Sequence, residues 1–329
     1  MTPRLGAAVL GVAIAAALAA PVLAPHTAVD HADGLLNAPP TVPHLRDDAG
    51  AWHRPFIYSW RLANQLEQRY EQDRSSRVPL VWLSHGRLVE SSDNARAPLM
   101  LLGADSFGQD VFSRVLFGAR LSLGLAAVAA LGAMLLGSTV GALAGFAGGL
   151  WDEALMGVTD FVMVLPAIYV ALALRVLLPD VLPPTTVFGM LSGIFAVLGA
   201  PFIARGVRAI VRSERRLDYA SAAQALGASD WRLLAHHLLP ATRGFIVVQI
   251  TLLVPAFIVA EATLSYVGLG FPHPIASWGT MLHDASSNIR VFADFPWLLS
   301  PAVAMFLVVF GLNLVLQQSG APVVYNEQK

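Results

Sequence analysis

The chain has 329 residues, of which 56% are hydrophobic and only 13% are charged, and its formal net charge is −1. A mean hydropathy of +0.61 argues for a membrane protein rather than a soluble domain. Cysteine is absent, which excludes disulfides, thiolate nucleophiles and cysteine metal sites. The only lysine is Lys329, so the chain has no phosphate loop of the form G-x-x-x-x-G-K-[ST]. We therefore expect any ATP and Mg²⁺ to be bound by another chain, and the near-zero charge gives no indication of nucleic acid.

Six apolar segments are long enough to cross a bilayer, which requires about 20 helical residues. In chain order they are Leu5–Leu23, Leu121–Leu150, Ala154–Leu178, Val181–Ala204, Phe245–Gly270 and Phe295–Leu316. The second segment is rich in glycine, which favours close helix–helix contact in lipid. The sequence therefore predicts an all-α polytopic protein with six transmembrane helices. The expected domains are a transmembrane helix at 1–24, an extracytoplasmic insert at 25–100, a transmembrane domain at 101–320 and a tail at 321–329.

The N-terminal segment also has the composition of a secretory signal peptide, with a short basic start, an apolar run and an alanine-rich end. Its apolar run is longer than a usual signal core, so we favour an uncleaved helix. In the insert, Tyr58–Arg74 has the pattern of an amphipathic helix, and RVPLVWLSHGRLVE, residues 77–90, has that of a β-hairpin. The insert is interpreted as a solvated addition, as a contact surface for a substrate-delivering protein, or as a cover over the pore mouth.

The distribution of arginine indicates the orientation in the membrane. Seven arginines separate the fourth and fifth segments, namely Arg205, Arg208, Arg212, Arg215, Arg216, Arg232 and Arg243. The connection after the third segment contains no arginine, and the connection after the fifth contains one, Arg290. Because positive charge favours the cytoplasmic side, we expect residues 205–243 to form a cytoplasmic loop. Six spans then place both termini in the cytoplasm, and the insert at 25–100 outside.

Residues 218–240 read DYASAAQALGASDWRLLAHHLLP and interrupt the apolar segments with a polar, helix-prone stretch. The pattern predicts a helix from Arg216 to about Leu226, a left-handed break at Gly227 and a restart at Ser229, because glycine suits the position after a helix and serine is a good N-cap. Pro240 is expected to end the second helix. Small residues on one helix face allow another protein to approach closely, so this stretch is predicted to be a docking element.

This stretch resembles the cytoplasmic loop of ABC importer permeases, which has the form E-A-A-x3-G-x9-I-x-L-P. The alanines, the glycine and the final Leu-Pro match, whereas Ser221 replaces the glutamate and His237 the isoleucine. The resemblance implies docking of ATPase subunits through Asp218, Ser221, Ala222, Ala223, Gly227, Trp231, Leu239 and Pro240.

A second resemblance is carried by LGADSFGQDVFSRVLFGARLSL, residues 102–123. It is similar to the segment LGTDxxGRDxxSRxxxGARxSL that precedes the second helix in permeases of the dipeptide/oligopeptide/nickel group. The residues that carry this motif are Gly103, Asp105, Gly108, Asp110, Ser113, Arg114, Gly118 and Arg120. Downstream, EATLSYVGLG at 261–270 and ASWGTML at 276–282 resemble further stretches of the same group. Ala104 and Gln109 depart from the usual threonine and arginine. The resemblance covers about residues 100–318.

The group is that of C-type permease subunits of bacterial dipeptide/oligopeptide ABC importers. The resemblance implies the type I importer permease fold, location in the bacterial inner membrane and no catalytic site in this chain. It also implies four kinds of partner: a second permease subunit, two ATPase subunits, an extracytoplasmic substrate-binding protein and membrane lipid. Peptide is the leading substrate class, with nickel or another small solute as the alternative.

Two charged residues in the apolar segments, Asp160 and Glu261, are candidates for the translocation path, because intramembrane charge is costly and usually faces a cavity or a partner. A structural hydrogen bond explains Glu261 equally well. The same two residues leave an ion-coupled secondary transporter as a distant alternative. The sequence argues against an intramembrane enzyme, since the six segments contain neither cysteine nor histidine. His236 and His237 are adjacent and point to different helix faces, so no metal site is expected.

Overall fold

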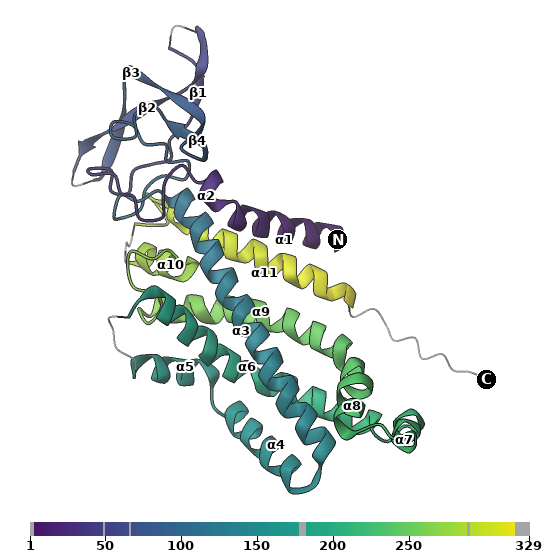
Figure 1. Ribbon diagram of the computed structural model, residues 1–329. Helices are drawn as coiled ribbons and strands as arrows, with labels where there is room; N and C mark the ends of the chain where they lie inside the picture. The colour runs from purple at the N-terminus through teal and green to yellow at the C-terminus, as the bar shows by residue number, and fades with distance from the viewer. Residues whose placement is uncertain (1–2, 49, 66, 178–181, 288–289, 320–329) are drawn as a thin grey trace. The chain divides into compact units, whose positions relative to one another are not determined.

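The computed structural model describes all residues except 1–2, 49, 66, 178–181, 288–289 and 320–329 (Figure 1). The expected tail at 321–329 therefore lies outside the described residues. The chain is mostly helical, and its contacts divide it into two compact units. We call Ala7–Leu123 with Ser265–Gly311 the sheet unit. The helical unit is Gly124–Leu264 with both ends of the chain.

The sheet unit contains a four-stranded antiparallel sheet of order β1-β2-β3-β4 (Figure 1). Its strands are β1 (His44–Arg46), β2 (Trp52–Asn64), β3 (Arg69–Ser84) and β4 (Arg87–Ser91). The prediction of an all-α protein is therefore wrong for the insert, and so is the helix predicted at Tyr58–Arg74. Aromatic and β-branched residues at 56–60 favour a strand. Cross-strand pairs such as Arg61 with Glu71 stabilise both strands. These pairs join residues that are distant in the chain, so the local helix propensity of the segment does not predict them.

The hairpin predicted at 77–90 is confirmed, because β3 pairs with β4 through Ser84 opposite Arg87. The two residues between them, His85 and Gly86, both have positive φ, at 49° and 78°. Two consecutive positive φ angles are the requirement of the tight hairpin turn that matches strand twist. Behind the sheet, a buried cluster is formed by Ile57, Val78, Leu80, Ala97 and Leu99.

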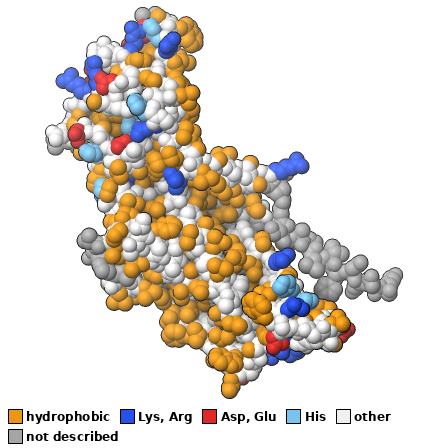
Figure 2. Space-filling model, viewed as in Figure 1, with side chains coloured by type: hydrophobic (Ala, Val, Ile, Leu, Met, Phe, Trp, Pro, Cys, Tyr) orange, Lys and Arg blue, Asp and Glu red, His pale blue; other side chains and the backbone are white. Residues whose placement is uncertain are grey.

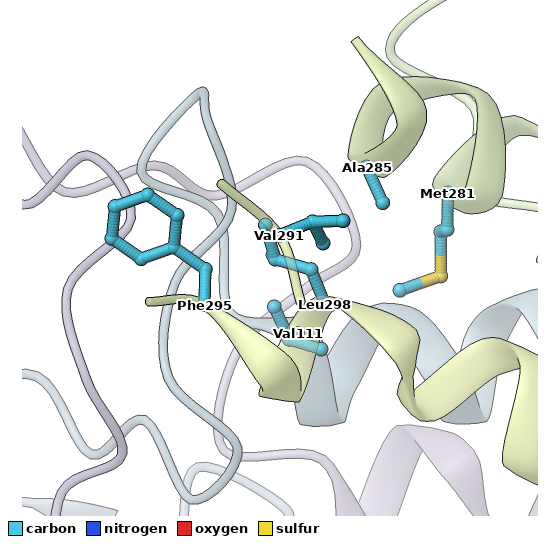
Figure 3. Close-up of a cluster of buried hydrophobic side chains, with 6 residues drawn as sticks. All are labelled: Val111, Met281, Ala285, Val291, Phe295 and Leu298. Carbon is cyan, nitrogen blue, oxygen red and sulfur yellow. The ribbon is translucent and has the colours of Figure 1, made fainter. Parts of the chain in front are cut away.

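The remaining elements of the sheet unit are helical. They are most of α1 (Pro3–Leu18), α2 (Ala20–Leu23), the start of α3 (Val111–Ala147), α10 (Trp278–Ser286), the 3-10 turn η3 (Pro296–Leu299) and most of α11 (Ser300–Ser319). A buried apolar cluster joins the first residue of α3 to α10 and to the segment before α11 (Figure 3). Its members are Val111, Met281, Ala285, Val291, Phe295 and Leu298. The cluster holds the beginning of α3 in place.

The helical unit contains the rest of α3, α4 (Gly149–Val164), α5 (Ala167–Val176), α6 (Pro184–Glu214), α7 (Asp218–Ala225), α8 (Asp230–Leu233) and most of α9 (Arg243–Tyr266). Helix α3 packs on α6 through glycines, as the composition of this segment predicts. A Cβ atom on Gly137 would lie 2.5 Å from the Ala200 carbonyl oxygen, and one on Gly145 would lie 2.7 Å from that of Arg208. The two backbones are thus closer than any side chain at these glycines permits.

The described residues contain four helices long and apolar enough to cross a membrane, and a fifth span if the bent pair α4 and α5 is one. The third predicted segment is broken rather than continuous, because Pro166 follows Leu165, whose backbone is extended. Helix α1 has 16 residues, fewer than the roughly 20 that a span requires. The count of six spans therefore stays a prediction. On the face seen in Figure 2, the long helices expose mainly apolar side chains, whereas charged side chains gather over the sheet and around α7 and α8.

Candidate functional site

Residues 215–242 include the stretch predicted to dock ATPase subunits, and we call them the docking segment; they form two short helical pieces separated by a glycine. Helix α7 ends at Ala225, and Gly227 has a φ of 84°, as predicted. Ser229 is the N-cap of α8, where its Oγ accepts a hydrogen bond from the Arg232 backbone N–H. Glycine tolerates this left-handed conformation without strain. The predicted order of helix, break, cap and helix is confirmed.

The second piece does not end at Pro240 as predicted. Helix α8 passes into a π-helical turn, η1 (Leu234–Leu238), and a 3-10 turn, η2 (Leu239–Thr242), before α9 begins at Arg243. The Leu239 N–H donates to the Leu234 carbonyl across the wider turn. Pro240 falls in the first turn of η2, where its missing N–H leaves no expected bond unmade. Irregular turns thus carry the chain past the proline into the membrane helix.

The docking segment presents large apolar side chains to the surface. Leu226 is 90% exposed and Trp231 is 72% exposed. Among the predicted docking residues, Asp218, Ser221, Ala222 and Gly227 are exposed, and Ala223, Leu239 and Pro240 are half-buried. Large apolar side chains that are exposed within a polar segment are typical of an interaction surface.

The same segment is fixed to the rest of the helical unit on its inner side. Ala220, Leu233 and Leu238 are buried. The Tyr219 hydroxyl donates a 2.7 Å hydrogen bond to the Glu214 carboxylate at the end of α6. The docking segment therefore has one packed side and one open side.

The expected cytoplasmic loop at 205–243 is partly helical, because α6 continues to Glu214. Its arginines pair with acids of α4. Arg208 and Arg212 both bind the Asp152 carboxylate, and Arg205 binds Asp160. Asp152 was not a predicted site residue; the only sequence signal is an acid at the start of a helix facing an arginine-rich segment. The pair Asp160–Arg205 is half-exposed, so Asp160 has a charge partner within its own chain.

Glu261, the other predicted path residue, lies on α9 and is fully buried at 0% exposure. It interacts with other groups of the chain. This placement fits the structural alternative left open by the sequence, and its role in a translocation path stays a prediction.

The motif at 102–123 is a buried, hydrogen-bonded turn that starts α3. One oxygen of Asp105 accepts hydrogen bonds from the backbone N–H groups of Phe107, at 2.8 Å, and Gln109, at 2.9 Å. Asp110 accepts from the backbone N–H of Ser113 at 3.0 Å and also from its hydroxyl. Both carboxylates thereby satisfy N–H groups that a turn or helix start leaves without partners.

The second half of the motif lies inside the helix rather than before it. Helix α3 begins at Val111, ten residues earlier than the predicted apolar segment, because Asp110 caps it there. Ser113, Arg114, Gly118 and Arg120 accordingly belong to the first three turns of α3. The run of apolar residues predicted only the part of the helix from Leu121 onward, because the first turns of α3 contain polar and charged residues.

Arg114 is a buried cation that lies close to two carboxylates. Its side chain is 1% exposed and pairs with Asp105, and it lies 3.5 Å from the Asp284 carboxylate of α10. Burial raises the pKa of Asp284, and the charge of Asp105 raises it further, against the opposing charge of Arg114. Asp284 was not predicted as a site residue, since nothing in its local sequence places it beside residue 114.

Glycines and tryptophans complete the packing around this turn. Gly103 and Gly108 have φ of 73° and 75°, and a Cβ on either would lie within 2.7 Å of a carbonyl oxygen. Gly118 lies against Trp278, whose indole N–H donates to the Val115 carbonyl at 3.1 Å. Seven of the eight motif residues are buried, and only Arg120 is exposed. No hydrogen bond or ion pair joins the Arg120 side chain to another described residue.

Comparison with known proteins identifies the family. Residues 137–320 match the family model described as a binding-protein-dependent transport system inner membrane component. The chain is 38% identical over 216 residues to the oligopeptide transport system permease protein OppC of Bacillus subtilis, covering 65% of this chain and 67% of that protein. It is 33% identical over 236 residues to the glutathione transport system permease protein GsiD of Pectobacterium atrosepticum, covering 71% and 74%. It is 37% identical over 214 residues to the dipeptide transport system permease protein DppC of Bacillus subtilis, covering 65% and 64%.

The chain therefore belongs to the family of inner-membrane components of binding-protein-dependent transport systems. Within it, the chain is a C-type permease subunit of the dipeptide/oligopeptide group, as the motif at 102–123 predicts. It is thus a multi-pass inner-membrane protein and a transporter subunit rather than an enzyme.

Proposed function

We propose that this chain forms half of the translocation path of an ATP-driven importer for peptides. A second permease subunit supplies the other half, and a substrate-binding protein delivers the peptide from outside. The chain binds no nucleotide itself, and two ATPase subunits dock on its cytoplasmic face and hydrolyse ATP. Relatives whose names refer to oligopeptide, dipeptide and glutathione transport support peptide as the substrate class.

The observation that carries this proposal is the open side of the docking segment. Leu226 and Trp231 lie on either side of Gly227 and are 90% and 72% exposed. Burial of such apolar groups is favoured by about 0.8 kcal/mol per CH₂ group, so a partner that covers them gains free energy. A partner that buries both in one state and releases one in another converts ATP binding into movement of α6 and α9. Such coupling requires only that the partner's contact differs between the two states.

Removal of Trp231 tests this surface. Trp231→Ala is expected to abolish co-purification with the ATPase subunits, because a fully buried tryptophan at an interface commonly contributes about 2 kcal/mol or more. Trp52→Ala is the matched control: Trp52 is 66% exposed, but it lies on β2 in the insert, and its loss should leave co-purification unchanged. Equal yields of ATPase subunits with both variants would refute docking at this surface. ATP hydrolysis by the isolated chain would refute the assignment of the nucleotide site to partners.

The substrate class and the orientation have separate tests. Membrane vesicles with the complete importer should take up a radiolabelled dipeptide in an ATP-dependent manner, whereas uptake of radioactive nickel instead would reassign the substrate. A reporter fused after Arg216 should be cytoplasmic, and one inserted within 60–90 should be external. Detection of both reporters in one compartment would contradict the six-span topology with both termini in the cytoplasm.

A further inference from the structure

The end of the β3–β4 hairpin exposes large apolar side chains. They belong to Val81, Trp82, Leu83 and Leu88, which we call the hairpin tip. Trp82 is 56% exposed and Leu83 is 78% exposed, and the strand register sets Leu83 across from Leu88, next to the turn. The buried cluster behind the sheet contains none of these four residues. The core of the sheet therefore does not account for them.

The other end of β3 has the opposite character. The β2–β3 connection at residues 64–71 reads NQLEQRYE and includes two glutamates and one arginine. Residues 74–89, which contain the hairpin tip, include no aspartate or glutamate. Turns that lie in water are expected to be polar. The two ends of this strand are therefore expected to lie in different surroundings.

Two details distinguish the hairpin tip from other exposed parts of the sheet. The Arg46 guanidinium lies 4.1 Å from the ring centroid of Trp52, the exposed tryptophan of β2, but among the described residues no ring or arginine stacks on Trp82. Leu83 has a φ of 54°, which leucine rarely adopts and which glycine or asparagine adopts more readily. A large apolar residue at such a position indicates that its side chain has a use.

The hairpin tip lies beside the end of the first apolar helical segment. Helix α2 follows α1 after a single residue, Ala19, and β4 packs against α2 (Figure 1). The Arg87 side chain, at the start of β4, donates to the carbonyl of Pro25, two residues after α2 ends. Helix α2 and the hairpin belong to the same compact unit.

The helical segment beside the hairpin has the surface of a membrane helix. Leu18 and Val22, near its end, are exposed, and the sequence from Leu5 to Leu23 contains no charged residue. The hairpin is thus held where an apolar helix ends. Tryptophan is enriched at this depth of membrane proteins, because its ring is apolar and its N–H reaches water or lipid headgroups.

We propose that the hairpin tip inserts into the lipid interface of the outer leaflet and anchors the insert to the membrane surface. Trp82 lies at the level of the headgroups, and Leu83 and Leu88 contact the acyl chains. A docked protein is the poorer occupant, because the apolar end of the hairpin is the end next to α2 rather than the end away from it. The choice of leaflet rests on the proposed orientation of the chain, whereas contact with lipid does not.

Spin labels test this contact. The chain has no cysteine, so a nitroxide attaches only to an introduced one. Leu83→Cys and Trp82→Cys label the hairpin tip, and Gln65→Cys labels the exposed β2–β3 connection. The importer is assembled with cysteine-free partner subunits in lipid nanodiscs, without its binding protein. Electron paramagnetic resonance then measures collisions of each label with oxygen, which concentrates in lipid, and with a nickel chelate, which stays in water.

The ratio of oxygen to nickel collisions should be severalfold higher at Leu83 and Trp82 than at Gln65. Equal ratios at the three positions would refute contact with lipid. Protection of both tip labels from both reagents would show that another subunit covers the tip, and it would refute the anchor as well. Addition of peptide-loaded binding protein should leave the tip ratio unchanged. A tip that is water-exposed until the binding protein covers it would be a protein-docking surface instead.

A charge substitution provides a second test of the same contact. Leu83→Asp places a carboxylate in the membrane interface, which is unfavourable, so the label at Trp82→Cys should fall to the collision ratio found at Gln65. Gln65→Asp adds the same charge at the polar end of the strand and should leave the ratio at Trp82→Cys unchanged. Leu83 is exposed, so its substitution does not disturb the core. An unchanged ratio in Leu83→Asp would overturn the anchor.

The reporter inserted within 60–90 separates this inference from the proposed orientation. If the reporter is external and the tip labels collide mainly with nickel, only the anchor is refuted. If the reporter is cytoplasmic but the tip labels collide mainly with oxygen, the hairpin still contacts lipid, and the assignment to the outer leaflet is refuted together with the orientation.

Discussion

The two motifs that resemble the importer family are opposite in their physical character. In the motif at 102–123, the charged and polar residues Asp105, Asp110, Ser113 and Arg114 are buried and bonded within the sheet unit. The docking segment at 215–242 contains large apolar residues, yet Leu226 and Trp231 are exposed. In a single soluble chain the reverse arrangement would be expected, since polar groups favour water and apolar groups favour the interior.

This difference is the one expected between a structural role and the interaction role proposed for the docking segment. A buried charge is retained where its partners are complete within the chain, as for Arg114 with Asp105. An exposed apolar side chain is retained where a second chain covers it. Arg120 is the exception in the first motif, because it is exposed and has no ionic partner among the described residues. The two arginines of one motif therefore allow a direct comparison.

The largest effect is expected from Arg114→Met. Removal of this side chain leaves Asp105 buried without its charge partner, which costs about 3–5 kcal/mol. Arg120→Met removes an exposed arginine of the same helix and should change stability by less than about 0.5 kcal/mol. Thermal unfolding of the purified complex in detergent measures both. A similar melting temperature for the two variants would show that burial does not distinguish the motif's arginines.

Glycines provide a second comparison, between packed and open positions. In Gly137→Ala the new methyl group meets the Ala200 carbonyl, so α3 and α6 must separate, at a cost of about 1–3 kcal/mol. Gly157→Ala, in α4, places its methyl group where no atom lies within 4 Å, and it should be neutral or slightly stabilising. The melting temperatures of the two variant complexes, compared with that of the unaltered complex, test this packing. Equal destabilisation by both substitutions would contradict close packing at Gly137.

Gly227 is open like Gly157 but conformationally constrained. No atom lies within 4 Å of a Cβ built there, and its φ is 84°. Valine at this position is strained by about 1–3 kcal/mol, which shifts α8 without disturbing the membrane helices. Gly227→Val should therefore leave expression and melting unchanged but reduce transport and the stimulation of ATPase activity by substrate. Normal coupling at normal expression would show that the docking segment does not transmit the signal.

Local signals in the sequence predicted the docking segment well. Gly227 and Ser229 each determine backbone geometry through their own chemistry, so the break and the cap were confirmed. Pro240 was misinterpreted, because its effect depends on whether the preceding turn is α- or π-helical, and the sequence does not specify that. The motif residues at 102–123 were found by resemblance, but the burial of Arg114 and its proximity to Asp284 depend on contacts between distant segments.

The insert shows the limit of local reasoning most clearly. Residues 58–74 contain leucine, glutamate and glutamine, which favour a helix. In the structure they form two strands, because Phe56, Ile57 and Tyr58 enter a buried sheet and pair with residues up to 23 positions away, as Phe56 does with Pro79. The hairpin at 77–90 was predicted correctly because its turn is local.

The smallest effect is expected from the caps, where the two regions differ only in burial. Ser229 caps α8 at the exposed surface, whereas Ser277 caps α10 through a reciprocal capping box and is 0% exposed. Ser229→Ala should cost about 0.5–1 kcal/mol, because water replaces the lost acceptor. Ser277→Ala should cost about 2 kcal/mol, because the Thr280 N–H is left with no substitute in the interior.

Hydrogen exchange adds to the melting temperatures by showing how far each cap substitution loosens the fold. In Ser229→Ala, faster exchange should be confined to α8 and the adjoining turns, and affinity for the ATPase subunits should fall modestly because the docking surface is less ordered. In Ser277→Ala, faster exchange should extend from α10 to the start of α3, since Trp278 and Met281 pack against that helix. Exchange confined to α10 would show that the cap is independent of the motif at 102–123. Exchange that spreads from α8 into α9 would show that the docking segment is as tightly integrated as the buried motif, and the contrast between the two regions would fail.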